Sequence, residues 1–142
     1  MPANRDAPSV LFVCVKNAGK SQMAAGLMRK IAGDSVRVYS AGTKPGAAVN
    51  ALSAESLAEV GVDITEEAPK PVDHKVIHGV DVVVVLGREA RVAPVAGTRF
   101  ENWDTDEPSE RGIDGIERMR LIRDDIAVRV ADLLSRMTTA DT

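Results

Sequence analysis

The single cysteine of this chain, Cys14, lies where a predicted strand meets a predicted helix. Residues 10–13 form an apolar run typical of a buried strand, and residues 22–31 (QMAAGLMRKI) have the composition of a helix. The unpaired amides and the dipole of a helix N-terminus bind anions and favour a thiolate over a thiol. The pattern predicts a nucleophilic cysteine beside a bound oxyanion; the alternative is an unreactive buried thiol at a strand end.

The loop from Cys14 to Ser21 (CVKNAGKS) has the residue types that an anion-binding turn requires. Asn17 and Gly19 tolerate backbone angles that most residues avoid, so successive amides can point inward. Lys20 would add a positive charge to the oxyanion, and the Ser21 hydroxyl would donate to the thiolate and stabilise it as a leaving group. The predicted oxyanion site comprises Val15, Lys16, Asn17, Ala18, Gly19, Lys20 and Ser21.

The end of this loop, Gly19-Lys20-Ser21, also matches the end of the nucleotide-binding P-loop. That motif begins with an earlier glycine, separated from Gly-Lys-Ser by four residues. The loop has no glycine before Gly19, so the nucleotide interpretation is rejected.

Strand-like and helical stretches alternate along the chain. We predict strands at residues 10–13, 36–40, 80–86 and 98–103, and helices at residues 22–31, 48–60 and 115–136. Such alternation is typical of an α/β domain with right-handed crossovers and helices on both faces of a parallel sheet. We therefore predict three αβα layers around a central four-stranded parallel sheet. Ligands bind at the carboxyl ends of the strands in such sheets, where Cys14 lies.

The last predicted helix, residues 115–136, has apolar residues at every third or fourth position along one face. We expect the arginines of this helix to form its solvated face: Arg118, Arg120, Arg123 and Arg129. Residues 1–142 are predicted to form a single domain, with flexible ends at residues 1–8 and 138–142.

Composition excludes several classes of function. The net charge of -3 and the aromatic content of 3% argue against a nucleic-acid partner. No apolar stretch is long enough to span a membrane, and the N-terminus lacks the apolar core of a signal peptide. One cysteine cannot form an internal disulfide or a thiolate-rich metal site. We expect a soluble cytoplasmic protein with no nucleic-acid or membrane partner.

Several motifs follow the order found in the low-molecular-weight protein tyrosine phosphatases and the arsenate reductases built on the same fold. Cys14, Lys20 and Ser21 stand where that family has a cysteine, five residues, an arginine, and a serine or threonine. Further segments resemble the arsenate reductase branch: residues 21–24, 39–42, 59–64, 103–108 and 123–126. The resemblance implies the family's flavodoxin-like topology and chemistry on arsenate or a phosphate-like oxyanion.

Two departures from the family concern predicted catalytic residues. Lys20 replaces the family arginine, and a lysine is a point charge rather than a planar fork for two oxygens, which weakens phosphatase chemistry. Glu107 precedes Pro108 where the family has its aspartic general acid, and Asp106 is a second candidate. The resemblance implies that one of these carboxyl groups protonates the leaving oxygen; the alternative is a solvated turn.

A third departure is that the chain lacks the two further cysteines with which thioredoxin-linked reductases resolve their first intermediate. Any reduction must then use a sulfur from outside the protein. The loop with Lys20 resembles the actinobacterial members that use mycothiol, whose arseno-mycothiol product is reduced by mycoredoxin, a glutaredoxin-type protein. We therefore predict an arsenate–mycothiol transferase acting in arsenic detoxification, with Cys14 as nucleophile, mycothiol as co-substrate and no bound cofactor.

Some reductases of this family bind a structural potassium ion. Asn17 and Ser40 match two of its ligands, but Ala25 stands in place of an acidic ligand and Lys70 stands near another. The ammonium group of Lys70 could substitute for the cation, and we predict no bound metal.

Two other functions fit the same loop. A phosphatase acting on phosphotyrosine or a small phosphate ester would need the same nucleophile and acid but no second thiol. A non-catalytic oxyanion-binding domain would keep the loop without turnover, and Lys20 is the residue that leaves this alternative open.

Overall fold

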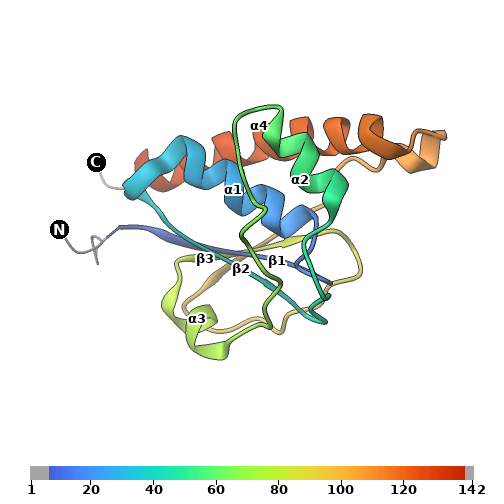
Figure 1. Ribbon diagram of the computed structural model, residues 1–142. Helices are drawn as coiled ribbons and strands as arrows, with labels where there is room; N and C mark the ends of the chain where they lie inside the picture. The colour runs from blue at the N-terminus through green and yellow to red at the C-terminus, as the bar shows by residue number, and fades with distance from the viewer. Residues whose placement is uncertain (1–6, 140–142) are drawn as a thin grey trace.

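The computed structural model describes residues 7–139. The strands in this range are β1 (Ser9–Cys14), β2 (Arg37–Gly42), β3 (Val82–Leu86) and β4 (Arg99–Trp103). The α-helices are α1 (Lys20–Ala32), α2 (Ala51–Ala58), α3 (His74–Gly79) and α4 (Gly115–Thr139) (Figure 1). Two 3₁₀ turns, η1 (Gly33–Ser35) and η2 (Pro108–Arg111), follow α1 and β4. No helix in the described range has both the length and the apolar character needed to cross a membrane.

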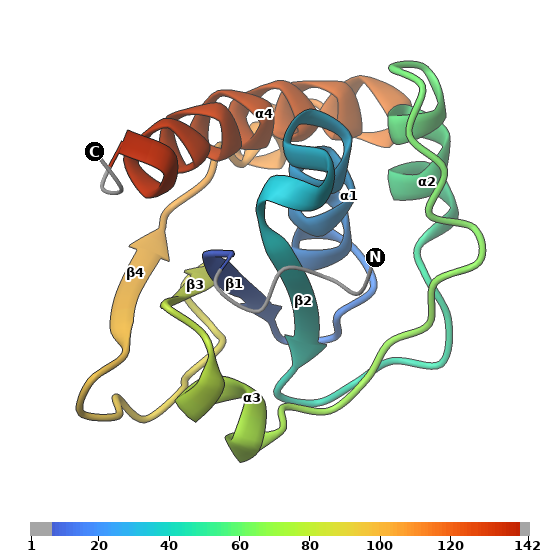
Figure 2. The same ribbon diagram turned by 90° about the vertical axis from the view of Figure 1, so that its left-hand side faces the viewer.

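The strands form one parallel sheet in the order β2-β1-β3-β4. Helices α1, α2 and α4 cover one face, and α3 lies against the other (Figures 1 and 2). This arrangement confirms the predicted three-layer α/β fold with a central four-stranded parallel sheet. Because parallel strands end at the same edge, the loops after β1, β3 and β4 are neighbours, and Cys14 lies at this edge.

The central strands β1 and β3 are buried on both faces, which explains their continuous apolar sequences. Val10 and Phe12 belong to the core that α1 and α4 cover, whereas Leu11 and Val13 belong to the core on the α3 side. Phe12 also contacts Trp103 at the end of β4, with ring centroids 5.8 Å apart. This packing fixes the end of β4, and the acidic loop that follows it, relative to β1.

Helix α2 starts three residues later than the apolar pattern predicts. Asn50 precedes the helix, and its side-chain oxygen accepts a hydrogen bond of 2.9 Å from the Ser53 amide. This cap satisfies one of the free amides of the first turn and sets the helix start at Ala51.

Parts of the predicted flexible ends lie in the described range, and their flexibility remains a prediction. Thr138 and Thr139 belong to α4. At the other end Ala7 is buried, and the Pro8 carbonyl accepts a hydrogen bond of 2.8 Å from the Arg37 amide. Residues 1–6 and 140–142 of the predicted ends lie outside the described range.

The four arginines of α4 that we expected to be solvated also form ion pairs, and only Arg123 is largely buried, with 12% of its side chain exposed. Arg120 and Arg123 both contact Glu59, just beyond α2, at 2.7 and 2.9 Å. Arg118 contacts Glu107 at 2.8 Å, and Arg129 pairs with Asp125 at 3.2 Å within α4. Helical periodicity indicates the polar face of a helix, but it cannot show which acidic residues the fold brings to that face. The pairs tie α4 to α2 and to the loop after β4.

Candidate active site

The loop after β1 is held by its carbonyl groups. Backbone amides of residues 43–50 donate hydrogen bonds of 2.7–3.1 Å to the carbonyls of Cys14, Val15, Lys16 and Ala18. In a trans peptide the carbonyl and the N–H point in opposite directions. The amide that follows each of these carbonyls therefore points away from residues 43–50. Accordingly, the Asn17 amide donates to Cys14 Sγ at 3.3 Å. The Asn17 amide therefore faces the sulfur, and the same orientation of the other loop amides, which would form an anion-binding nest, remains a prediction.

Asn17 holds the loop together from inside. It has a positive φ of 52° and its side chain is buried. Its Nδ2 donates to Ser21 Oγ at 2.7 Å, while its Oδ1 accepts from Gln22 Nε2 at 3.1 Å and from the Lys70 amide at 3.0 Å. A primary amide is suited to this position because it donates and accepts at once and tolerates the left-handed backbone.

The sulfur of Cys14 lies 2.9 Å from the Ser21 hydroxyl, and both residues are buried. Because Asn17 Nδ2 donates to Ser21 Oγ, the serine is left with its own proton to donate to the sulfur. A hydroxyl that donates to sulfur stabilises the thiolate, so the expected interaction between these residues has the geometry it needs.

Gly42 permits the close approach between β2 and the loop. A Cβ atom at this position would lie 2.7 Å from the Val15 carbonyl oxygen and 2.9 Å from the Asn17 nitrogen. Real Cβ atoms essentially never come so close to backbone. The sequence reasoning assigned no role to Gly42, although the break in the strand pattern at this residue was an available signal.

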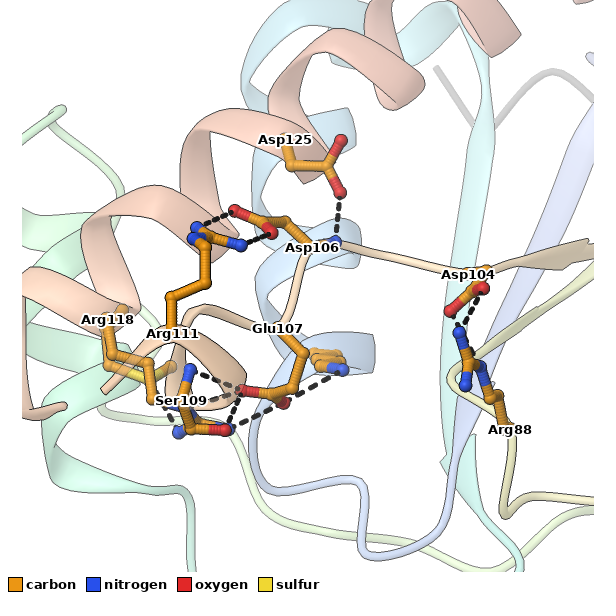
Figure 3. Close-up of polar contacts among 10 residues, drawn as sticks. Arg88, Asp104, Asp106, Glu107, Ser109, Arg111, Arg118 and Asp125 are labelled. Carbon is orange, nitrogen blue, oxygen red and sulfur yellow. Dashed lines mark hydrogen bonds and ion pairs between the residues drawn. The ribbon is translucent and has the colours of Figure 1, made fainter. Parts of the chain in front are cut away.

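Lys20 and Glu107, which lie far apart in the sequence, come together beside the loop. Lys20 Nζ is 3.7 Å from Glu107 Oε1. Arg118 holds both carboxylate oxygens of Glu107, at 2.8 and 2.9 Å, and the Ser109 hydroxyl donates at 2.8 Å (Figure 3). The hydrogen bonds from Arg118 and Ser109, with the charge of Lys20, lower the pKa of Glu107 to about 2 despite partial burial. From the sequence, Arg118 was expected only on the solvated face of the last helix, with no role at this site.

Asp106, the second candidate acid, points toward Arg111 instead (Figure 3). Its carboxylate binds the Arg111 guanidinium at 2.8 and 3.1 Å, and this contact holds the pKa of Asp106 below its usual range. The nearby Asp104 is paired with Arg88 in the same way. Of the two candidates, Glu107 is therefore the one in contact with Lys20.

Removing the Arg118 guanidinium should change the acid stability of the protein. A carboxyl group whose pKa is lowered on folding stabilises the folded state above its unfolded pKa, and that contribution is lost as the pH falls through the folded value. The wild type should therefore lose stability between pH 4.5 and about pH 2 through Glu107. Near neutral pH, Arg118→Met should be less stable than the wild type by about 1–2 kcal/mol. On acidification it should lose less of its free energy of unfolding than the wild type does.

Urea unfolding across this pH range measures the effect, with Arg91→Met as a control at an exposed arginine. If the free energy of unfolding depends on pH equally in wild type and Arg118→Met, the Arg118–Glu107 pair is not the cause of the acid sensitivity.

The suggested replacement of a potassium ion by the Lys70 ammonium group remains a prediction. Lys70 Nζ is exposed and donates to the Ala68 carbonyl at 3.0 Å. Ser40 Oγ and Gln22 Oε1 are buried without partners in the described range. Ala25 supplies no anionic ligand there, so these residues do not fit the family's cation site. In residues 7–139 no group of three or more His, Cys, Asp or Glu side chains is placed to hold a metal; the absence of a metal remains a prediction.

Known proteins similar to this chain include several arsenate reductases. The arsenate reductase 2 of Staphylococcus epidermidis is 31% identical over 134 residues, which cover 92% of this chain and 99% of that protein. A thioredoxin-dependent arsenate reductase from Corynebacterium glutamicum superposes with a TM-score of 0.80 at 34% identity over 94% of this chain. This chain spans only 63% of that longer one. A structure described as an arsenate reductase in the phosphate-binding state has the same TM-score of 0.80 at 28% identity, covering 92% of this chain and 98% of its own.

The match to a family covers nearly the whole chain. Residues 9–141 match the description "Low molecular weight phosphotyrosine protein phosphatase". The match begins at the first residue of β1 and includes the cysteine loop and the Glu107 loop. The resemblance seen in the sequence is thereby confirmed: the chain belongs to the low molecular weight phosphotyrosine protein phosphatase family.

Proposed function

We propose that this protein is an arsenate reductase that passes arsenic from Cys14 to an external thiol, mycothiol. One observation carries the proposal: the only thiol of the chain lies at the loop after β1, in contact with the Asn17 amide and the Ser21 hydroxyl, and the sequence has no second cysteine to resolve an intermediate. The relatives described as arsenate reductases support the substrate, since two of them match more than nine tenths of this chain.

In the first step arsenate binds to the loop amides and Lys20. The Cys14 thiolate attacks arsenic, an S–As bond forms, and one As–O bond breaks. A proton on the departing oxygen makes it leave as water, and Glu107 is the proposed donor. The charge of a bound arsenate beside Lys20 opposes ionisation of Glu107, so binding raises the proton affinity of a carboxylate that is otherwise held ionised.

In the second step a mycothiol thiolate attacks the same arsenic. A new S–As bond forms, the Cys14–arsenic bond breaks, and Cys14 leaves as a thiolate that the Ser21 hydroxyl stabilises. Arsenic stays pentavalent in this transfer. A mycoredoxin-type glutaredoxin then supplies the electrons that reduce the released adduct.

The test is an assay with arsenate, mycothiol and mycoredoxin in which reductant consumption is followed. We expect turnover that requires mycothiol and Cys14, and that thioredoxin does not support in place of the small thiol. Absence of Cys14-dependent turnover with all small thiols would reject the proposal.

The family membership supports phosphatase activity as a second candidate function. Lys20→Arg would restore the planar fork that can hold two phosphoryl oxygens. We expect this variant to raise kcat/KM for an aryl phosphate about tenfold. A charge-assisted bidentate contact stabilises the transition state more than a point charge does, by roughly 1–2 kcal/mol. An aryl phosphate rate of ordinary enzymatic size in the wild type would favour the phosphatase over the reductase.

A further inference from the structure

We propose that Glu107 makes the oxyanion site select anions that carry a hydroxyl group, such as arsenate and phosphate, over sulfate, which carries none near neutral pH. The inference rests on the proposed function, in which Lys20 contacts the bound oxyanion. It gives Glu107 a part in the choice of substrate that is separate from its proposed role as proton donor.

One oxygen of the Glu107 carboxylate keeps an acceptor position open. Oε2 accepts hydrogen bonds from Arg118 Nε and from the Ser109 hydroxyl, both at 2.8 Å. Oε1 accepts a single hydrogen bond within residues 7–139, from Arg118 Nη2 at 2.9 Å. A carboxylate oxygen has two lone pairs, so Oε1 can accept a second hydrogen bond. Lys20 Nζ lies 3.7 Å from Oε1, which is an ion-pair distance but too long for a hydrogen bond.

The Glu107 carboxylate is fixed in position and ionised. One guanidinium group, that of Arg118, binds both of its oxygens (Figure 3). This contact is the main cause that lowers the pKa of Glu107 to about 2, and the Ser109 hydroxyl and the charge of Lys20 add to it. An ionised carboxylate accepts hydrogen bonds and cannot donate them. Glu107 therefore attracts a ligand hydroxyl and repels a ligand oxygen that has no proton.

Lys20 places a bound oxyanion next to this carboxylate. It is the first residue of α1 and directly follows Gly19 of the loop. The side chains of Lys20 and Glu107 are 23% and 28% exposed, and both line the same cavity, so a ligand can reach them. An ammonium group has three N–H donors and can bind an oxyanion while it stays beside Glu107. The same contact would turn a hydroxyl of arsenate toward the proposed proton donor.

Inorganic phosphate and sulfate separate hydrogen bonding from charge. At a mildly alkaline pH both are mainly tetrahedral dianions of similar size, but the phosphate dianion keeps one hydroxyl and sulfate keeps none. Arsenate has the same protonation pattern as phosphate. The charge repulsion from Glu107 is therefore similar for both dianions, and only the hydroxyl-bearing one can donate to Oε1. A site built to hydrogen-bond a substrate hydroxyl rejects an analogue that lacks it.

Calorimetric titration of phosphate and of sulfate into the full-length protein tests the inference. The wild type should bind sulfate about tenfold or more weakly than phosphate, since hydrogen bonds to charged groups are among the strong ones. Glu107→Gln should reduce this ratio to about twofold or less, because an amide can donate to sulfate or accept from phosphate. Equal binding of the two anions by the wild type, no binding of phosphate, or a ratio that survives Glu107→Gln would overturn the inference.

Asp106→Asn is the matched control. It removes a negative charge from the neighbouring residue, whose carboxylate binds Arg111 at 2.8 and 3.1 Å instead of pairing with Lys20. Its ratio of sulfate to phosphate Kd should equal that of the wild type. A fall as large as in Glu107→Gln would show that loss of charge, rather than loss of the open acceptor, changes the selectivity, and it would also overturn the inference.

The titrations separate this inference from the proposed function, because they need no thiol and no turnover. If no thiol supports arsenic transfer but the selectivity depends on Glu107, the proposed function fails and the inference stands. If transfer occurs but the wild type binds phosphate and sulfate equally, the inference fails and the proposed function stands. The wild-type ratio alone can refute the inference, so the test does not depend on how well the Glu107→Gln variant folds.

Discussion

Cys14→Ser should abolish transfer of arsenic to mycothiol while the fold and oxyanion binding persist. A serine hydroxyl is far less ionised than a thiol at neutral pH, and loss of a nucleophile lowers kcat by about 10⁴-fold or more. The amides that bind the oxyanion belong to the backbone, and the carbonyls that orient them stay bonded to residues 43–50. Serine is close to cysteine in size, so the buried position should accept it.

Two measurements check this expectation together. Turnover is followed in the mycothiol and mycoredoxin assay, and binding is followed as the rise in thermal stability with added arsenate or phosphate. A ligand at 100 times its Kd stabilises the folded state by about 2.7 kcal/mol, so binding is readily seen. Residual turnover close to that of the wild type would contradict Cys14 as the nucleophile, whereas binding without turnover in the wild type itself would favour the non-catalytic oxyanion domain.

Gly42→Ala should damage both stability and catalysis, although it adds only a methyl group outside the anion site. The new Cβ would meet the Val15 carbonyl oxygen at 2.7 Å and Lys16 C at 2.9 Å, and neither is the end of a flexible side chain. The loop must shift, and overpacking of this kind costs about 1–3 kcal/mol. Displacing catalytic groups by about 1 Å lowers rates by roughly 10²-fold, so transfer should fall by this order.

Gly46→Ala is the matched control in the same segment. Its added Cβ would lie 3.7 Å from the Lys16 side chain, an ordinary contact. Urea unfolding and kcat/KM for arsenate should therefore remain close to wild type in this variant. If Gly42→Ala behaves like Gly46→Ala, then the loop does not depend on the close approach at Gly42.

The elements of the fold could be predicted because their signals are local. The β-branched run of β3 and the three-to-four spacing in α4 are patterns that burial imposes on neighbouring residues. The cysteine loop could be predicted for the same reason, because Cys14 and Ser21 meet within one strand–turn–helix unit. Such patterns fix positions only to within a few residues, which is why the capping bond at Asn50 shifted the start of α2.

The sequence by itself therefore determined the α/β class, the single thiol and the loop that holds it. Only the tertiary structure decided that Arg118 binds Glu107, that Lys20 forms an ion pair with the same carboxylate, and that Gly42 must lack a side chain. These contacts join residues that are distant along the chain, and their geometry depends on how the helices and strands pack. The spacing of apolar residues indicates whether a residue is buried or exposed. It does not indicate which distant group that residue contacts.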